Sequence, residues 1–185
     1  LEGSKVPDLH AKIHNDTAEA KAIAKLLELQ EKIGNKLHIC HLSSKKGLEL
    51  VKKAKKGGFG RSVTCEITPH HLFLDSAAYK KLGNLVKCNP SIKPRKDREA
   101  LWKGLVAGDI DIIATDHAPH TLEEKKKPYK DAPSGVPGIE TMMPLLLDLA
   151  FRKKIGLERV VGACCERPAE IFDWQSKGRI AQGLD

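Results

Sequence analysis

The chain alternates short apolar runs with longer amphipathic stretches, and this order constrains the fold more than any other feature. Strands are predicted over residues 36–40, 61–67, 85–88 and 109–115, and helices over residues 17–33, 45–56, 76–82, 95–106, 139–151, 157–165 and 168–173. Apolar residues recur at helical spacing in the longer stretches, and turn residues bound the short runs. Strands separated by helices pair in parallel through crossover connections. The sequence therefore predicts an α/β fold with a parallel sheet.

A reactive side chain lies at the end of each predicted strand or directly after it. These residues are His41, Glu66, Asn89 and Asp116, which lie 23 to 27 residues apart. That spacing fits one strand and one helix, and a (β/α)8 barrel collects its catalytic residues at the carboxyl ends of its strands. A doubly wound open sheet would also gather residues there. However, no G-x-G-x-x-G or G-x-x-x-x-G-K-[ST] motif follows a strand, so the pattern favours a TIM-barrel fold.

The length does not fit a complete barrel. The chain has 185 residues and four clear strands, whereas a complete barrel takes about 250 residues. Half a barrel exposes two unpaired strand edges and an uncovered core, which associate or aggregate unless something covers them. We therefore expect one domain over residues 1–185 that forms a partial barrel, with the remainder supplied by further segments or by a partner.

Charge and cysteine usage narrow the range of functions. The formal net charge is +8, but the lysines are spread over predicted helix faces and one loop, and only 4% of the residues are aromatic. A nucleic-acid partner is therefore disfavoured. Five scattered cysteines without a C-x-x-C pair argue against a disulfide framework or a zinc ribbon. No stretch contains the roughly 20 apolar residues of a membrane helix, and neither end has a signal pattern, so we expect a cytoplasmic protein without membrane contact.

Five segments around the predicted strand ends carry a family pattern. They are HICHLSSKKGLEL, VTCEITPHHLFL, VKCNPSIKPRKDREALWKGL, IIATDHAPHTLEEK and APSGVPGIETMMPLLLDL. Together, and in family order over residues 17–182, they resemble the carboxyl-terminal half of the dihydroorotase family of the amidohydrolase superfamily. TCEITPHHLFL and DHAPHTLEEK look like dihydroorotase in particular, because allantoinases and hydantoinases read closer to TCPHYL and SDHSP.

The resemblance implies a metal-dependent (β/α)8 barrel of which this chain forms roughly the second half. Dihydroorotases interconvert N-carbamoyl-L-aspartate and L-dihydroorotate in pyrimidine biosynthesis, usually with two zinc ions bridged by a carbamylated lysine. A bound metal polarises the amide carbonyl and lowers the pKa of its bound water to about 7. The resemblance also implies a small-molecule substrate and, for many family members, association with themselves or with aspartate carbamoyltransferase.

The resemblance assigns metal-binding roles to residues at the strand ends. His41 matches the histidine that ligates the second, more buried metal. Asp116 matches the aspartate that ligates the first metal and shuttles a proton, for which a carboxylate must lie within hydrogen-bond reach. Glu66, Cys40 and His71 lie where some family members gather an additional zinc.

Four further positions match substrate-binding positions of the family. Asn89 and His120 match residues that bind the substrate, and Ser134 and Gly135 align with a loop pair that contacts the substrate ring through its backbone. The open form of the substrate is a dianion. Neutral or cationic groups such as Asn89 and His120 suit its carboxylates, and a basic protein attracts it.

Simpler structural roles stay open for several of these residues. His41 could be a hydrogen-bonded core histidine, and Asp116 could cap the helix or loop that follows it. The adjacent residues His70 and His71 cannot both point into one strand-end site, so at least one of them is structural.

The chain departs from the family pattern in its metal ligands. The H-x-H pair of the family, the arginine after it, the carbamylated lysine and one further histidine are not found in the sequence. His10 and His14 lack the H-x-H form, and we interpret them as surface or loop residues because Pro7 and Asn15–Asp16 are turn signals. With one family ligand for each metal, tight binding of two metals by this chain alone is not expected, since zinc sites use three or four protein ligands.

We therefore expect a segment of a longer enzyme, without the amino-terminal barrel strands and the small β-sandwich domain. The favoured hypothesis is a zinc-dependent dihydroorotase, a cyclic amide hydrolase, whose isolated 185-residue chain is inactive. An allantoinase or hydantoinase is the alternative among enzymes. A non-catalytic scaffold for aspartate carbamoyltransferase is the alternative from another class of function, and a nucleic-acid binder is the least favoured hypothesis.

Overall fold

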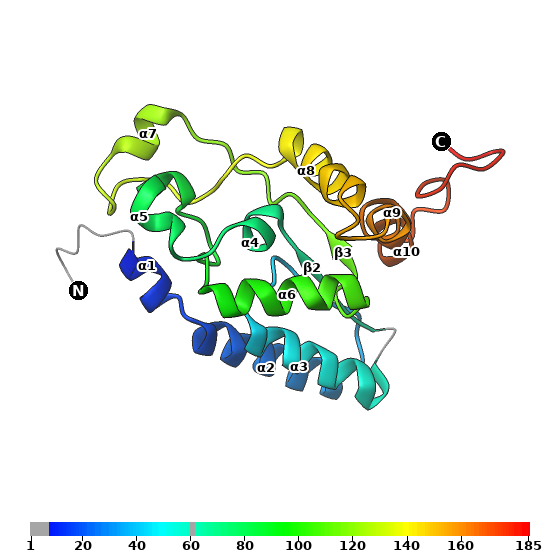
Figure 1. Cartoon of the computed structure of the whole chain (residues 1–185). Helices are drawn as coiled ribbons and strands as arrows, with labels where there is room; N and C mark the ends of the chain where they lie inside the picture. Colours follow the sequence, from blue (N-terminus) through cyan, green and yellow to red (C-terminus); the bar gives the residue numbers. More distant parts are fainter. Residues whose placement is uncertain (1–7, 60–61) are drawn as a thin grey trace.

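The computed structural model describes residues 8–59 and 62–185 (Figure 1). The helices are α1 (Asp8–Ile13), α2 (Asp16–Ile33), α3 (Lys45–Ala54), α4 (Pro69–Phe73), α5 (Ala78–Leu82), α6 (Arg95–Ala107), α7 (Leu122–Lys126), α8 (Ile139–Phe151), α9 (Leu157–Val161) and α10 (Arg167–Ile171). The strands are β1 (Leu37–Ile39), β2 (Val63–Ile67) and β3 (Ile112–Ile113), and three short helical segments are η1 (Lys55–Phe59), η2 (Gly83–Val86) and η3 (Gly162–Glu166). Within this part of the chain, no helix has both the length and the apolar character needed to cross a membrane.

The three strands form one parallel sheet in the order β1, β2, β3. Leu37 of β1 pairs with Val63 of β2, and Glu66 of β2 pairs with Ile112 of β3. α3 lies in the connection from β1 to β2, and α4, α5 and α6 lie in the connection from β2 to β3 (Figure 1). The predicted α/β class with a parallel sheet is therefore confirmed.

The strand predicted over residues 85–88 is wrong. η2 ends at Val86, and the next backbone carbonyls bond to a loop and to a side chain instead of a neighbouring strand. The Lys87 carbonyl accepts the Gly135 N–H at 2.8 Å, and the Cys88 carbonyl lies 2.8 Å from His10 Nε2. Asn89 consequently follows a loop.

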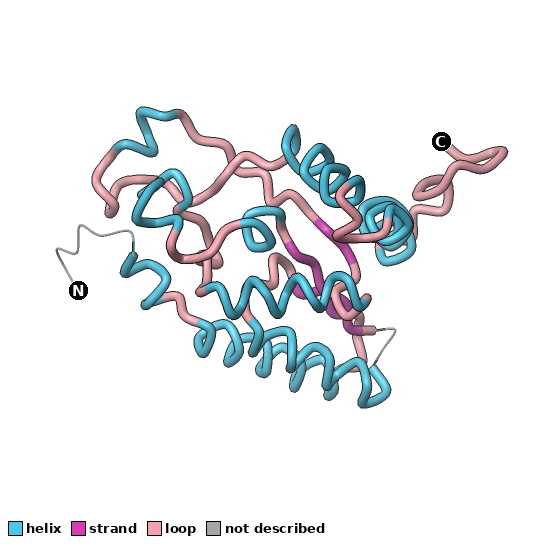
Figure 2. The backbone as a smooth tube through the Cα atoms, in the orientation of Figure 1, coloured by secondary structure: helices cyan, strands magenta, loops and turns pink. Residues whose placement is uncertain are grey.

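The core lies between the sheet and the helices that cover one of its faces, chiefly α2, α3 and α6 (Figure 2). Side chains alternate between the two faces of a strand, and Ile39, Cys65 and Ile67 point into this core. Its buried members are Ile23, Ile39, Leu42, Leu48, Val51, Val63, Cys65, Ile67, Leu72, Leu101, Leu105, Ile110, Ile113, Leu146, Ile155, Val160 and Ala163. His38 and Glu66 alternate with core residues, so the opposite face of the sheet is polar.

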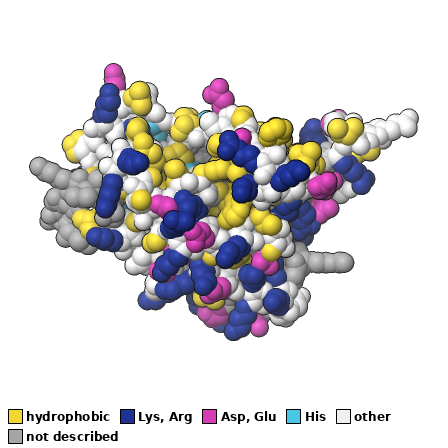
Figure 3. Space-filling view, in the orientation of Figure 1, with side chains coloured by type: hydrophobic (Ala, Val, Ile, Leu, Met, Phe, Trp, Pro, Cys, Tyr) yellow, Lys and Arg dark blue, Asp and Glu magenta, His cyan; other side chains and the backbone are white. Residues whose placement is uncertain are grey.

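Charged and apolar side chains are mixed on the surface. Figure 3 shows lysine and arginine side chains spread among acidic and apolar ones, without a single basic patch on this face. α8 exposes Ile139, Leu145 and Leu147, and Phe151 at its end is 89% exposed. Within the described residues, β1 and β3 are the edge strands of the sheet. Apolar faces and open sheet edges of this kind mark surfaces that other segments or chains cover.

Asp111 ties the start of β3 to three neighbouring elements. Its Oδ2 lies 2.5 Å from Lys55 Nζ and accepts the Cys65 N–H at 2.8 Å. Its Oδ1 lies 3.3 Å from Arg167 Nη2. The side chain is buried, so this carboxylate joins η1, β2 and α10 through contacts that are largely shielded from water.

Asp111→Asn is expected to lower the free energy of unfolding by about 2 kcal/mol, because it leaves two cations without their carboxylate. Asp109→Asn is the matched control. Asp109 pairs with the more exposed Lys52 at 2.5 Å, and its replacement is expected to cost less than about 1 kcal/mol. Urea unfolding followed by circular dichroism measures both losses, and equal losses would contradict the role given to Asp111.

His10 is buried, so its predicted position at the surface is wrong. It lies in α1 and is only 3% exposed, whereas His14 is exposed. His10 Nδ1 lies 2.6 Å from the Tyr129 hydroxyl, and Nε2 lies 2.8 Å from the Cys88 carbonyl. A neutral ring satisfies both contacts, with Nε2–H as donor and Nδ1 as acceptor. Burial lowers the pKa of His10, and the nearby His14 lowers it further.

The native state therefore disfavours protonation of His10, whereas the unfolded chain protonates it with an ordinary pKa of about 6.5. Below that pH the unfolded state binds more protons, so the free energy of unfolding is expected to fall between about pH 7 and pH 5. His10→Gln should make this decline shallower, while His70 and His71, whose pKa values burial also lowers, keep their share of it. His14→Gln should leave most of the decline. Urea midpoints across this range measure the effect, and equal declines in the wild type and His10→Gln would refute it.

Candidate functional site

His41 and Asp116 lie beyond the carboxyl ends of β1 and β3 in an unusual backbone conformation. Their φ angles are 36° and 47°, in the left-handed region that is costly for residues with a side chain. Such a conformation persists where the surroundings fix it. For His41, one fixing contact is the Glu66 carboxylate, whose Oε1 accepts the His41 N–H at 3.1 Å. A side chain of β2 thereby holds the turn after β1.

His70, in α4 after β2, faces Asp116. Its Nε2 lies 3.8 Å from Asp116 Oδ2. Among the residues that the structure describes, His70 Nε2 and His41 Nδ1 are buried atoms without a hydrogen-bond partner. Buried polar atoms are seldom left unpaired. Two unpaired imidazole nitrogens near one carboxylate therefore indicate a place for a ligand.

The protonation of this group suits a metal ion. Burial and, to a smaller extent, the nearby His41 lower the pKa of His70 to about 4. Burial raises the pKa of Asp116, Glu66 also raises it and His41 opposes this change. At neutral pH the His70 ring is thus unprotonated, and neutral imidazoles and carboxylates are common zinc ligands. The residues present fit a divalent metal ion at this edge of the sheet.

His71 is held in place by structural contacts. Its Nδ1 lies 2.7 Å from Thr68 Oγ1 and its Nε2 lies 3.1 Å from the Pro90 carbonyl, so both nitrogens have partners. His70, His71 and Cys88 have ligand atoms within 4.8 Å of one another, but only His70 keeps an unpaired nitrogen in this group. The family resemblance pointed to His71 for an additional zinc and gave no role to His70, whereas the structure leaves only His70 with an unpaired ring nitrogen. Thr68, three residues before His71, is the signal that separates them.

A second group of metal-ligating residue types lies next to His41. His38, Cys40 and Glu66 have ligand atoms within 4.8 Å of one another. His38 Nε2 lies 3.0 Å from Glu66 Oε2. Burial alone would raise the pKa of Glu66, but the hydrogen bonds from His38 and the His41 N–H outweigh it and lower the pKa. Burial raises the pKa of the Cys40 thiol, so the thiol stays protonated when no cation is bound.

Three of the four predicted substrate positions meet in one place. His120 Nε2 lies 3.2 Å from the Ser134 carbonyl. The Gly135 N–H donates at 2.8 Å to the backbone carbonyl two residues before Asn89. Gly135 has a φ of 140°, and an added Cβ would lie 2.6 Å from Ala118, so this close approach requires glycine. Asn89 lies beside the group, on the segment to which the Gly135 loop is bonded.

A hollow of about 650 Å³ connects the end of β1 to the loop of Asn89. Cys40, His41 and Asn89 line it, together with Glu19 of α2 and Lys93. Residues with predicted metal-binding and substrate-binding roles therefore share one open space. Its polar lining combines a cation, a carboxylate, an amide and an imidazole, so groups of either charge can be bound there.

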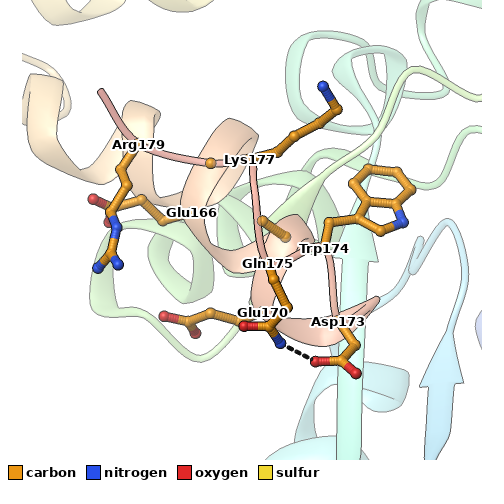
Figure 4. Close-up of a pocket in the computed structure, with 9 residues that line it drawn as sticks. Glu166, Glu170, Asp173, Trp174, Gln175, Lys177 and Arg179 are labelled. Carbon is orange, nitrogen blue, oxygen red and sulfur yellow. Dashed lines mark hydrogen bonds between the residues drawn. The ribbon is translucent and has the colours of Figure 1, made fainter. Parts of the chain in front are cut away.

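A different hollow, of about 450 Å³, lies beside α10 (Figure 4). Its lining comes from η3, α10 and the chain that follows, and includes Glu170, Trp174 and Arg179. Figure 4 shows a hydrogen bond between Gln175 and Asp173 at its rim. No residue predicted for the site lines this hollow, so the candidate site is the group at the strand ends.

Comparison with curated proteins finds close relatives. No protein-family model matches the chain. The chain is 42% identical over 182 residues to a protein named dihydroorotase from Methanothermobacter thermautotrophicus, and 44% identical over 168 residues to one of the same name from Halobacterium salinarum. These matches cover 97% and 91% of this chain, but the chain spans only 40% and 38% of the length of the two relatives.

Solved structures of two hydantoinases share the fold of this chain. The chain matches L-hydantoinase (dihydropyrimidinase) from Arthrobacter aurescens with a TM-score of 0.89 and 31% identity, over 99% of this chain and 41% of that one. It matches D-hydantoinase (dihydropyrimidinase) from a Thermus species with a TM-score of 0.92 and 27% identity, over 100% of this chain and 42% of that one. The predicted partial barrel with an open parallel sheet is confirmed.

Gly135→Ala is expected to displace the loop that carries Ser134, because the added Cβ would lie 2.6 Å from Ala118. The strained backbone and the clash should lower the free energy of unfolding by about 2 kcal/mol, and amide hydrogen exchange over residues 133–136 should become faster. Gly57→Ala is the control, since its added Cβ meets nothing within 4 Å. Mass spectrometry measures the exchange, and unchanged exchange in Gly135→Ala would show that the approach is not tight.

Proposed function

We propose, from the premise that this chain is a dihydroorotase-related amidohydrolase, that it carries one side of the active site of a zinc-dependent dihydroorotase. The reaction is the reversible cyclisation of N-carbamoyl-L-aspartate to L-dihydroorotate in pyrimidine biosynthesis. The observation that supports it most is the convergence of His41, His70 and Asp116 at strand ends in a chain 42% identical to a dihydroorotase. Because the chain spans 40% of that relative, we propose the activity for the complete protein and expect the 185-residue chain alone to be inactive.

His41 and Asp116 are the residues of this chain that would hold zinc. His70 is a further candidate, because its Nε2 is buried and unpaired among the described residues. When bound, the metal supplies polarisation of the substrate carbonyl and a lowered pKa of water. In the cyclisation direction, the carbamoyl nitrogen forms a bond to the carbon of the side-chain carboxylate and loses a proton. One oxygen of that carboxylate leaves as water, which takes up this proton and a second proton from solvent. We assign to the Asp116 carboxylate the transfer of the proton from the nitrogen to the departing oxygen.

An additional metal beside the first site is a weaker part of the proposal. Cys40 and Glu66 are the residues that would hold it, and His38 is close enough to join them. His71 is less suited to this role than the sequence suggested, because both of its ring nitrogens are hydrogen-bonded.

We assign substrate binding to the group around Gly135. The contact of His120 with the Ser134 carbonyl lets one small molecule reach both residues at once. Asn89 and His120 would bind the substrate carboxylates through an amide and an imidazole. The N–H and carbonyl of Gly135 are bonded to Lys87 and Lys125, so the Ser134 N–H is the backbone group of this pair that we assign to the polar edge of the ring.

The surroundings of the site fit a larger assembly. In the complete protein, we propose that residues 1–185 belong to one cytoplasmic barrel domain. The edge strands β1 and β3 and the exposed apolar residues of α8 would then be covered by further barrel strands or by a partner. Another copy of the protein and aspartate carbamoyltransferase are the two partners that we propose.

A hydantoinase-type cyclic amidohydrolase is the second candidate. The high structural similarity to the two hydantoinases favours it. The higher sequence identity to proteins named dihydroorotase favours the first candidate. The substrates differ in the carboxylate beside the ring, so a substrate panel separates the two functions.

Asp116→Ala is expected to lower turnover of N-carbamoyl-L-aspartate by the complete gene product about a thousandfold, because a proton carrier and a metal ligand are lost together. Asp148→Ala is the control, since Asp148 pairs with Arg152 on α8 at 2.9 Å, away from the strand ends. The assay contains zinc and bicarbonate, with dihydroorotate, hydantoin and allantoin as parallel substrates.

Three outcomes of this assay would contradict parts of the proposal. Full activity of Asp116→Ala would remove this residue from the reaction, and faster turnover of hydantoin or allantoin than of dihydroorotate would select the second candidate. Turnover by the isolated 185-residue chain would show that the chain does not depend on further segments.

A further inference from the structure

Lys125, at the end of α7, is a buried lysine whose ammonium group donates to three backbone carbonyls. Its side chain is 6% exposed. Its Nζ donates to the carbonyls of Lys87 at 3.1 Å, Pro133 at 3.0 Å and Gly135 at 2.8 Å. Burying an ammonium group costs free energy unless its hydrogen bonds are satisfied. Packing alone therefore does not explain why a lysine, rather than an apolar residue, is buried at this position.

The number of donors matches the number of acceptors. A protonated lysine has three N–H donors, and each of them has a carbonyl here. A neutral amine would leave one carbonyl without a donor. Hydrogen bonds from a charged donor are stronger than neutral ones, so the ammonium is a rigid junction between the segments that supply the carbonyls.

Those segments are the ones that carry the proposed substrate contacts. Pro133 and Gly135 bracket Ser134, and Lys87 lies two residues before Asn89. The Gly135 N–H bonds to the same Lys87 carbonyl at 2.8 Å, which ties the two segments directly. Lys125 therefore bonds to the residues on both sides of Ser134 and to the loop segment that precedes Asn89.

The other end of α7 is anchored beside His120. Thr121 caps the helix by accepting the Glu124 N–H at 3.2 Å, and the Glu124 carboxylate accepts the Thr121 N–H at 2.8 Å. α7 thus connects His120, which precedes its first turn, to Lys125 in its last turn, and holds the two residues at a fixed separation. One element fixes the relative positions of three proposed substrate-binding groups.

We propose that Lys125 is a positioning residue for substrate binding, which holds the Ser134–Gly135 backbone at a fixed separation from Asn89 and His120. This inference rests on the proposed function, because the loop has a ligand only if the substrate assignment is correct. Lys125 itself is fully bonded to backbone and touches no substrate. Its loss should loosen binding of the cyclic amide and its open dianion while leaving the metal ligands in place.

The test compares Lys125→Met with Lys126→Met in the complete gene product. Methionine keeps the length of the chain but removes the charge and all three donors, and Lys126 is the exposed neighbour on the same helix. Lys125→Gln is a milder variant that keeps part of the donor capacity and serves if Lys125→Met does not fold. Steady-state kinetics with dihydroorotate, zinc content and amide hydrogen exchange are measured for each variant.

We expect Lys125→Met to raise KM about tenfold, as for a lost positioning contact, with kcat and zinc content close to those of the wild type. Exchange over residues 130–137 should become faster in Lys125→Met, to a smaller extent in Lys125→Gln and not in Lys126→Met. An unchanged KM, or a loss of zinc in step with activity, would overturn the proposal. So would exchange that rises equally throughout α2 and α3, because Lys125 would then only stabilise the fold.

The two proposals fail in different ways. If the wild-type protein turns over no cyclic amide, the proposed function is wrong, and the exchange data alone decide whether Lys125 holds the loop. If the wild type is active and Lys125→Met has an unchanged KM, the function stands and the positioning role of Lys125 is wrong.

Discussion

Parallel hydrogen bonding between β1, β2 and β3 is the constraint on which the rest of the structure depends. Parallel strands have their carboxyl ends on the same side of the sheet, so the residues that follow the strands meet there. His41, His70 and Asp116 follow the three strands in this way. The crossover helices return the chain to the amino-terminal ends of the strands and pack on one face of the sheet. His38 and Glu66 therefore lie on the opposite, polar face. The bond from the His41 N–H to Glu66 then couples two neighbouring strand ends.

The elements that the sequence predicts well are those whose environment is set locally. Residues 61–67 include the β-branched residues Val63, Thr64 and Ile67, and β2 occupies Val63–Ile67 within them. Residues 85–88 have a similar pattern but form no strand, because the carbonyls of Lys87 and Cys88 bond to Gly135 and His10. Those partners are distant in the sequence, and periodicity carries no information about them.

The same limit applies within the site. Strand spacing was sufficient to bring Asp116 and His41 to one edge, but it could not choose between His70 and His71. That choice depends on the Thr68 hydroxyl, which occupies one nitrogen of His71. The burial of Lys125 could not be predicted from the sequence either, because a lysine in a run of charged residues is usually exposed. Its burial follows from three carbonyls that converge only when the loop of Gly135 folds against the segment before Asn89.

Metal binding by His41 and Asp116 at one edge of the sheet is tested most directly by anomalous X-ray diffraction from crystals of the zinc-loaded complete protein. Scattering at the zinc absorption edge locates the ions independently of catalytic activity. We expect zinc within about 2.2 Å of a His41 nitrogen and of an Asp116 oxygen. Zinc bound elsewhere, with both residues free of metal, would contradict the assignment of the strand ends as the metal centre.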